Sequence, residues 1–351
     1  MSVASDSLDR TVLVALQKGG TTKTTSVAEI GRAAAGLGAR VLLVDFAPNA
    51  NLTQTLMGFD IAEGDFLTAA DIIAPGLPMG SARDAVVEVP EQWQFDETAT
   101  WETGGRYTDG GVLTIIPGSP LLQDVADKPV PGGDLRLQRA LVGVASEFDL
   151  VLIDTDPTTG KASQLATLAA GWQIGPVLPS PGANDGALTQ IRFLEAFAAG
   201  WMHPVKFAGV FVSAYDKRLT IAHGRPAAAL RELLDEYQPT NPDAVTHRPI
   251  PGLDGYETGR VFPQVVPSRA AAQNAAAEAR SVATVPGGLG VANVYAQLAV
   301  VLLHLVEAPM LPRLLAEFEQ RGLPGVWPLD PWPARSEVPA AAEGAETVEG
   351  E

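Results

Sequence analysis

Short, nearly continuous apolar runs recur along the chain, and most are followed by a turn and a segment with helical spacing of its apolar residues. Such runs are typical of parallel strands, because helices cover both faces of a parallel sheet. The runs occupy residues 11–16, 40–45, 112–117, 148–154, 175–179 and 207–213. Their alternation with helical segments predicts an α/β fold, with a doubly wound, mostly parallel sheet flanked by helices and a ligand at its carboxyl edge.

Apolar residues at helical spacing fill most of the intervals between these runs. The first predicted helix starts near Thr24 and Thr25, whose hydroxyls suit a helix N-terminus, and it ends at Gly36 and Gly38. The other predicted helical segments are residues 54–76 in pieces, 121–144 with a loop at 129–133, 186–199 and 292–306.

Residues 86–111 interrupt the alternation of predicted strands and helices. This segment is acidic, its apolar residues show no helical spacing, and we interpret it as an insertion. The insertion carries Trp93 and Trp101. We favour a surface hairpin with both tryptophans packed inward, and the alternative is a partner-binding site.

The two ends of the chain extend beyond a main domain predicted at residues 11–306. Residues 1–10 read as a flexible N-terminus, and residues 307–351 as a C-terminal extension. Within the extension, apolar spacing predicts a helix at 311–320, and the charged, Ala/Glu-rich composition predicts a disordered acidic end from about residue 335.

Composition narrows the class of protein. The 351 residues, 46% hydrophobic, suffice for one large α/β domain or two smaller ones. The absence of cysteine excludes disulfides, thiolate metal sites and a cysteine nucleophile. The N-terminus has no signal-peptide pattern and no apolar run approaches the roughly 20 residues that span a bilayer, so we expect a cytoplasmic protein. The end of the chain is acidic and is not a basic amphipathic helix, so we expect no membrane binding.

The net charge of −17 argues against unrestricted nucleic-acid binding, since phosphate contacts require local positive charge. Residues 61–130 hold 12 acidic and 3 basic residues, whereas residues 201–300 are nearly neutral. The C-terminal half therefore has room for a local basic face.

A glycine loop joins the first predicted strand to the first predicted helix. Gly19 and Gly20 allow successive backbone N–H groups to point into one concavity at a helix N-terminus, which suits a polyphosphate. Lys23 adds a cation, and Thr24 adds a hydroxyl able to bind Mg²⁺. The spacing departs from the ordinary P-loop, because Gln17 and Thr22 stand where that pattern has glycines.

The sequence Lys18-Gly19-Gly20-x-x-Lys23-Thr24-Thr25 resembles the deviant P-loop of the ParA/MinD ATPases. The resemblance covers roughly residues 10–305 without the insertion, and it implies ATP and Mg²⁺ as cofactors. It implies that Lys18 contacts phosphates held by the other subunit of a dimer, whereas Lys23 acts within its own subunit. The ATP-binding residues that it implies are Lys18, Gly19, Gly20, Thr21, Thr22, Lys23, Thr24 and Thr25, with Pro267 and Arg269 in a loop at 261–269 that contacts adenine.

Two aspartates follow predicted strands at the edge where the nucleotide is expected. By resemblance, Asp154 ends a Walker B strand. Asp45 ends another predicted strand, and Asp45, Pro48, Asn51 and Thr53 stand in the places that the family pattern expects for that segment. Thr24, Asp45 and Asp154 are therefore the expected Mg²⁺ ligands.

One residue departs from the family pattern at a catalytic position. Ala47 replaces the aspartate that positions the attacking water, so we expect slow hydrolysis. Asp156 is an extra carboxylate close by, and it either assumes part of the water-orienting role or is a solvated loop residue. The candidate catalytic residues are Lys18, Lys23 and Asp156.

The resemblance implies a partition ATPase that segregates or positions a plasmid, chromosome or other cargo. ATP would join two subunits into a sandwich dimer that binds non-specific DNA on the nucleoid, and a ParB-like or adaptor protein would stimulate hydrolysis. The candidate DNA contacts, each also explicable as an ordinary surface or nucleotide-loop cation, are Lys217, Arg218, Arg269 and Arg280.

Two alternatives remain open. Thr22 and Ala47 are consistent with a hydrolysis-deficient, nucleotide-held dimerisation scaffold. The acidic composition is consistent with an ATP-dependent regulator that lacks DNA binding.

Overall fold

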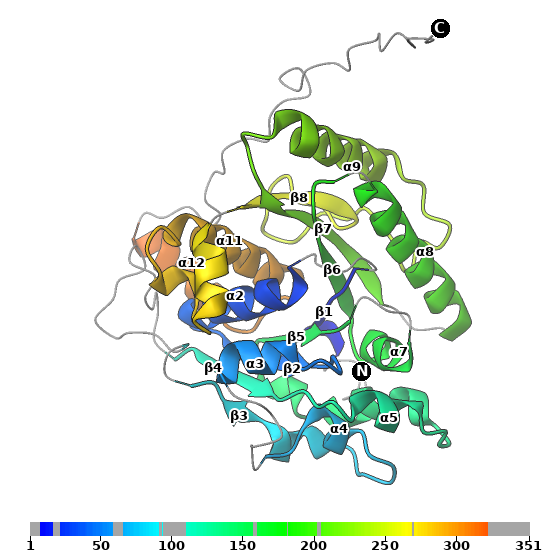
Figure 1. Ribbon diagram of the computed structural model, residues 1–351. Coiled ribbons are helices and arrows are strands. Elements are labelled where there is room, and N and C mark those ends of the chain that lie inside the picture. The colour runs from blue at the N-terminus through cyan, green and yellow to red at the C-terminus, as the bar shows by residue number, and fades with distance from the viewer. Residues whose placement is uncertain are drawn as a thin grey trace, which may run out of the picture.

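The computed structural model arranges helices on both sides of a central sheet (Figure 1). The described residues are 8–16, 22–58, 66–90, 93, 110–156, 160–180, 182–201, 205–268 and 270–321.

Among the described residues, eight strands form one sheet in the order β3-β4-β2-β5-β1-β6-β7-β8. Neighbouring strands run parallel, except that β3 pairs antiparallel with β4 at one edge. The strands are β1 (Thr11–Val14), β2 (Arg40–Asp45), β3 (Val87–Glu88), β4 (Val112–Ile116), β5 (Leu150–Asp154), β6 (Trp172–Val177), β7 (Lys206–Tyr215) and β8 (Arg260–Pro267). The predicted doubly wound, mostly parallel sheet is confirmed.

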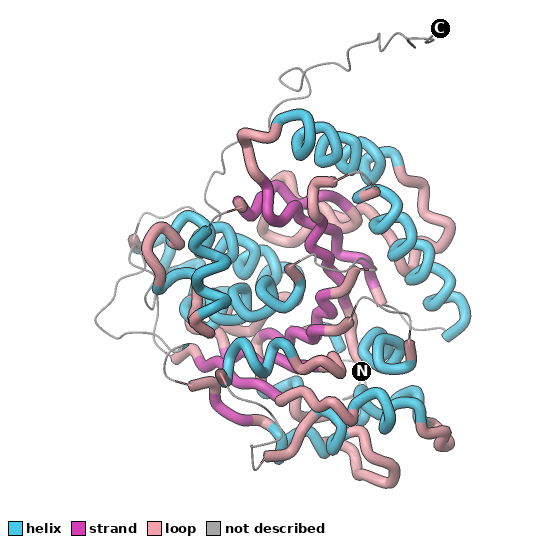
Figure 2. Tube along the Cα trace, viewed as in Figure 1, coloured by secondary structure: helices cyan, strands magenta, loops and turns pink. Residues whose placement is uncertain are grey.

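The continuous apolar runs have a structural reason, because each central strand is buried on both faces. In β1, Val12 and Val14 belong to one core, whereas Leu13 belongs to the core on the opposite face. One face is covered by α2 (Lys23–Gly36), α3 (Asn51–Met57), α10 (Ala270–Ala277), α11 (Leu289–Leu305) and α12 (Leu311–Gln320). The other is covered by α4 (Ala69–Ile72), α5 (Leu122–Asp127), α6 (Arg136–Leu141), α7 (Lys161–Leu168), α8 (Ala183–Trp201) and α9 (Arg225–Glu236). Figure 2 shows these layers in cyan on both sides of the magenta strands.

Two segments differ from the expectations. Residues 261–266, predicted as part of a loop, lie in the edge strand β8, where Pro263 is tolerated because an edge strand leaves some N–H groups unpaired. Residues 121–144 form the two short helices α5 and α6 with the predicted loop between them, and a 3₁₀ turn η5 (Gly133–Leu135) precedes α6.

The insertion is anchored by one tryptophan. Trp93 is buried, and its Nε1 donates a hydrogen bond of 2.9 Å to the carbonyl oxygen of Ala279, after α10. The inward packing predicted for the tryptophans is thus confirmed for Trp93. Trp101 lies outside the described residues.

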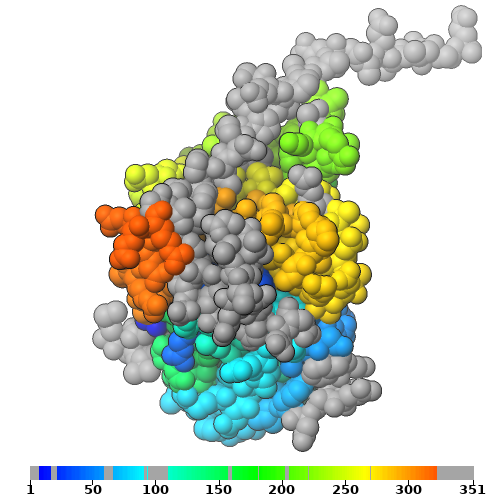
Figure 3. Space-filling model, turned by 90° about the vertical axis from the view of Figure 1, so that its left-hand side faces the viewer, coloured from blue at the N-terminus to red at the C-terminus, as the bar shows by residue number. Residues whose placement is uncertain are grey.

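The helix predicted at residues 311–320 is α12, and it belongs to the same core as α2 and α11. Leu314 and Phe318 are buried in that core, while the outer side of α12 forms part of the molecular surface (Figure 3, orange). No helix in the described part of the chain is long and apolar enough to cross a membrane.

Candidate functional site

Two buried aspartates lie side by side at the carboxyl edge of the sheet. Asp45 is the last residue of β2 and Asp154 the last residue of β5, and the two are partners in the parallel register of these strands. Their exposed fractions are 0% and 1%, respectively. This is the edge at which open α/β sheets bind ligands.

The helix after the glycine loop contacts one of these aspartates directly. Thr24 lies in the first turn of α2, and its Oγ1 donates a hydrogen bond of 2.7 Å to Oδ2 of Asp154. The other oxygen, Oδ1 of Asp154, is buried and accepts no hydrogen bond from the described residues. A buried carboxylate oxygen without a donor is costly, and a cation beside it would remove that cost.

Asp45 is held in place by residues that follow it in the chain. Its Oδ2 accepts hydrogen bonds from the backbone N–H and from the Oγ1 of Thr53, at 2.8 and 2.7 Å. Thr53 Oγ1 in turn accepts a hydrogen bond of 2.8 Å from the N–H of Gly118. A Cβ at position 118 would lie 2.7 Å from Cγ of Asp45, so only glycine permits this close approach.

Burial is the largest cause of the raised pKa values of Asp45 and Asp154. It raises the pKa of Asp45 to about 6, although the hydrogen bonds from Thr53 act in the opposite direction. Burial, with the charge of Asp45 next, raises the pKa of Asp154 to about 7. Lys23 is also buried, which lowers its pKa, while the charges of Asp154 and Asp156 oppose that shift. A divalent cation would favour the ionised form of both carboxyl groups.

The donor set fits Mg²⁺ bound together with a phosphate. The described residues contain no group of three His, Cys, Asp or Glu side chains able to hold a metal ion. Asp45, Asp154 and the hydroxyl of Thr24 are available, and Mg²⁺ is commonly bound through one or two carboxylates, water and substrate phosphates. Thr24, Asp45 and Asp154 would hold the ion, and the N-terminus of α2 would face the phosphates.

Asp156 lies two residues beyond Asp154 and is half-buried. Its Oδ1 accepts a hydrogen bond of 3.5 Å from Nδ2 of Asn49, in the loop that follows β2. Burial raises the pKa of Asp156, and the charge of Lys23 lowers it. Ala47 lies in the same loop as Asn49 and has no polar side-chain atom. Asp156 is a further carboxylate whose charge raises the pKa of both Asp45 and Asp154.

The structure tests the remaining predicted site residues only in part. Lys18, Gly19, Gly20, Thr21 and Arg269 lie outside the described residues. Thr22 precedes α2 with φ of 63°, a left-handed conformation that is costly for a β-branched residue. Thr25 lies in the first turn of α2, and Pro267 is the last residue of β8.

Two of the candidate DNA contacts are engaged in ion pairs. Arg218 pairs with Asp216 at 2.6 Å, and Arg280 pairs with Glu278 at 3.2 Å. Lys217 is exposed, with no ion pair among those of the described residues. These pairs reduce the positive charge that two of the candidates can offer to a phosphate.

Sequence reasoning placed Thr53 in the family pattern without a role, and it missed Gly118 and Asn49. A glycine directly after a predicted strand end, at the edge already holding two aspartates, is a usable signal for a close backbone approach. The contact of Asn49 with Asp156 joins residues 107 positions apart, which no local pattern reveals.

Thr53→Val is expected to destabilise the protein by about 2 kcal/mol, because it removes a donor from Asp45 and leaves the N–H of Gly118 unpaired in the core. It should also raise the pKa of Asp45 above about 6. Urea unfolding at pH 8 measures the loss. Thr55→Val is the matched control on α3, since Thr55 Oγ1 only contacts the carbonyl oxygen of Asn51 on the same helix. Equal effects of the two substitutions would contradict the role of Thr53.

Comparisons with known proteins identify the family and support the fold. A family profile described as an AAA domain matches residues 9–200. The chromosome-partitioning ATPase Soj of Treponema pallidum is 26% identical over 215 residues, which cover 61% of this chain and 75% of that protein.

Two solved structures have a similar fold. Cobyrinic acid a,c-diamide synthase from Mycobacterium smegmatis, with bound ADP and magnesium, is 28% identical with a TM-score of 0.52 and covers 70% of this chain and 88% of its own. A variant of McdA from Cyanothece, in complex with ATP, has a TM-score of 0.60 at 16% identity and covers 91% of this chain and 98% of its own, a likeness of fold alone.

Proposed function

We propose that this chain, which belongs to the AAA-domain family as a ParA/MinD-type P-loop ATPase, binds Mg²⁺-ATP at the sheet edge that holds Asp45 and Asp154. Slow hydrolysis of the bound ATP would then drive partition of DNA or another cargo. The observation that carries the proposal is the contact of Thr24 with Asp154 beside the paired Asp45. This contact joins the first turn of α2, the helix proposed to bind phosphate, to the ends of β2 and β5, where Mg²⁺ is proposed to bind.

Each residue has a distinct role in this proposal. Thr24, Asp45 and Asp154 hold the cation, and Thr53 keeps the carboxyl group of Asp45 in place. Lys23, buried at the start of α2, neutralises phosphate charge, and the glycine loop with Lys18 surrounds the phosphates of the two subunits. Mg²⁺ when bound would stabilise charge on the phosphates. Pro267 and Arg269 would contact the adenine.

Asp156 is proposed to orient the attacking water in place of the missing carboxylate at Ala47. It is half-buried, is oriented by Asn49 and lies close enough to Lys23 for their charges to interact. A carboxylate in this environment can accept a hydrogen bond from water without being fully solvated.

Asp156→Ala is expected to lower the rate of ADP formation at least about 10-fold while ATP is still bound, because a positioned proton acceptor is lost and the cation ligands remain. Single-turnover rates and filter retention of labelled ATP measure the two steps separately. Asp124→Ala, an exposed carboxylate on α5, is the control. Unchanged turnover in Asp156→Ala would refute the role of Asp156.

The partition role requires an ATP-dependent homodimer that binds DNA without sequence preference, and a ParB-like or adaptor partner. The name of the Soj relative, a chromosome-partitioning ATPase, supports this role. The role in turn implies a cytoplasmic protein that associates with the nucleoid. DNA binding at several salt concentrations tests it, because phosphate contacts must weaken steeply as salt rises. Lys217→Glu should weaken DNA binding more than Arg218→Glu, since Arg218 already pairs with Asp216.

A second candidate is a nucleotide-held dimerisation scaffold or regulator that lacks DNA binding. Ala47 and the strained conformation of Thr22 favour slow or absent hydrolysis, and the ion pairs of Arg218 and Arg280 favour weak DNA contact. Retention of intact ATP together with salt-insensitive, negligible DNA binding would support this candidate over partition.

A further inference from the structure

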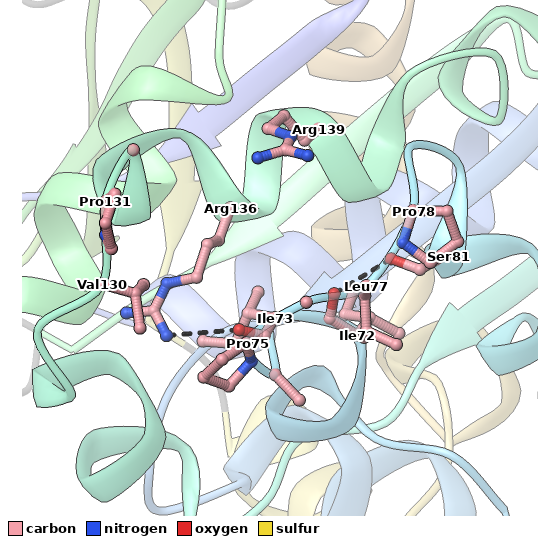
Figure 4. Close-up of a pocket in the computed structure, with 13 residues that line it drawn as sticks. Ile72, Ile73, Pro75, Leu77, Pro78, Ser81, Val130, Pro131, Arg136 and Arg139 are labelled. Carbon is pink, nitrogen blue, oxygen red and sulfur yellow. Dashed lines mark hydrogen bonds between the residues drawn. The ribbon is translucent and has the colours of Figure 1, made fainter.

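A cavity of about 320 Å³ lies between two loops on the face of the sheet covered by α4 to α7. One wall is the turn after α4, residues 72–78, and the other is the loop at residues 130–132 that precedes η5. Ser81 and, from α6, Arg136 and Arg139 complete its lining (Figure 4). We call this cavity the arginine pocket.

The walls of the arginine pocket are mainly apolar. Ile72 and Ile73 are buried in the core beneath it, and Pro75, Pro78 and Val130 line its sides. The same turn exposes Leu77 at 38% and the neighbouring Met79 at 66%. Apolar side chains that gather at the mouth of a cavity are typical of a docking site rather than of an ordinary surface.

Arg136 brings a buried positive charge to this apolar cavity. Its guanidinium donates hydrogen bonds to the carbonyl oxygens of Ile73, Val125, Ala126 and Gly133, at 2.6 to 3.2 Å, and so ties both loops together. Figure 4 shows the bond to Ile73 between the two walls. These carbonyl groups satisfy the donors but carry no net charge, and no ion pair among the described residues includes Arg136.

Arg139 adds a second cation one turn further along α6. It is exposed and likewise has no ion pair among the described residues. Asp134, which lies just before α6, already pairs with Lys161. The charge of Asp134 also acts on Arg136, but no carboxylate of the described residues forms an ion pair with Arg136 or Arg139. In a chain of net charge −17, two such cations beside an apolar cavity favour a ligand that combines carboxylate and apolar groups.

The chain itself contains a segment of this chemistry. Residues 336–351 include five glutamates and no Lys or Arg, interspersed with Val338, Pro339, several alanines and Val348. Thirty residues follow Arg321, the end of the described structure, and such a length spans about 100 Å when extended. The radius of gyration of a domain of this size is about 20 Å, so chain length does not prevent the segment from reaching the pocket.

We propose that the acidic segment at residues 336–351 docks into the arginine pocket of its own chain, with glutamates facing Arg136 and Arg139 and with valine, proline and alanine side chains against the apolar walls. The inference does not depend on the ATPase activity, because none of the residues involved belongs to the Asp45–Asp154 site.

The absence of cysteine allows a direct test on the full chain. Met79→Cys and Ala341→Cys together, treated with a short bismaleimide in the absence of nucleotide, should give an intramolecular crosslink that peptide mass spectrometry identifies. Gln54→Cys with Ala341→Cys is the distance control, since Gln54 is exposed on α3 on the opposite face of the sheet. The pocket pair should crosslink several times more efficiently than the control pair.

Charge variants in the Met79→Cys/Ala341→Cys background separate specific docking from random encounter. Arg139→Glu, or glutamine at all five glutamates of the segment, should lower the crosslink yield about fivefold, while Arg192→Glu on α8 should leave it unchanged. Circular dichroism checks that each variant is folded. Equal yields at Met79 and Gln54, insensitivity to Arg139→Glu, or crosslinks only between two chains would overturn the proposal.

Discussion

Asp154→Asn is expected to lower Mg²⁺-dependent ATP turnover by at least about 100-fold, because it removes a proposed cation ligand from the Asp45–Asp154 pair at the carboxyl edge of the sheet. The amide can still accept the hydrogen bond from Thr24, so the local geometry should survive. The same substitution should make the nucleotide-free protein more stable at pH 8, because a buried charge beside Asp45 disappears.

The opposite signs of these two effects distinguish a cation site from a structural carboxylate. Asp149→Asn is the matched control, since Asp149 precedes the same strand β5 and accepts hydrogen bonds from the N–H groups of Arg40 and Met310. That variant should lose stability and keep its turnover per folded molecule. If Asp154→Asn destabilised the protein as Asp149→Asn does, and left turnover intact, the magnesium site would be refuted.

The nucleotide-free protein is expected to lose stability as the pH rises from 5 to 8. The folded pKa values of about 6 for Asp45 and about 7 for Asp154 lie above the ordinary value of an unfolded aspartate, so the folded state holds protons that the unfolded state has released. Their contribution is complete below about pH 4 and is lost as the pH passes through 6 and 7. Between pH 5 and pH 8 the loss from Asp154 alone is on the order of 3 kcal/mol.

Urea unfolding at pH 5, 6.5 and 8 measures this loss, with and without Mg²⁺-ATP. The double variant Asp45→Asn/Asp154→Asn should flatten the dependence, and a residual slope of the same sign should remain because burial also raises the pKa of Glu29. Mg²⁺-ATP should stabilise the wild-type protein more at pH 8 than at pH 5. Parallel curves for wild type and double variant would show that the pair does not control the pH dependence.

The sheet, and the sheet edge at which the candidate site lies, could be predicted from the sequence because both depend on local patterns. Val12, Leu13 and Val14 are apolar in succession since β1 is buried on both faces, and Asp45 and Asp154 each end such a run. Strand β8 was harder to predict, because Pro263 and Gln264 interrupt its apolar pattern and only its edge position accommodates the proline.

Contacts between residues far apart in the chain could not be predicted, because no local sequence pattern indicates them. Trp93 and Ala279 are 186 residues apart, and nothing near either residue indicates the other. The four carbonyl oxygens around Arg136 come from three segments whose approach depends on the packing of α4, α5 and α6. Thr53 stood in the expected place, but its role became clear only when Gly118 was found to donate to it.

A single-turnover assay tests the central claim most directly: protein in excess over labelled ATP, with Mg²⁺ and duplex DNA, following retained nucleotide and ADP together. We predict that the wild-type protein retains ATP and converts it slowly to ADP, and that Lys23→Ala, which removes the buried cation at the start of α2, abolishes conversion. ATP that stays intact on the wild-type protein, or ADP formed equally by Lys23→Ala, would contradict a working ATPase at this site.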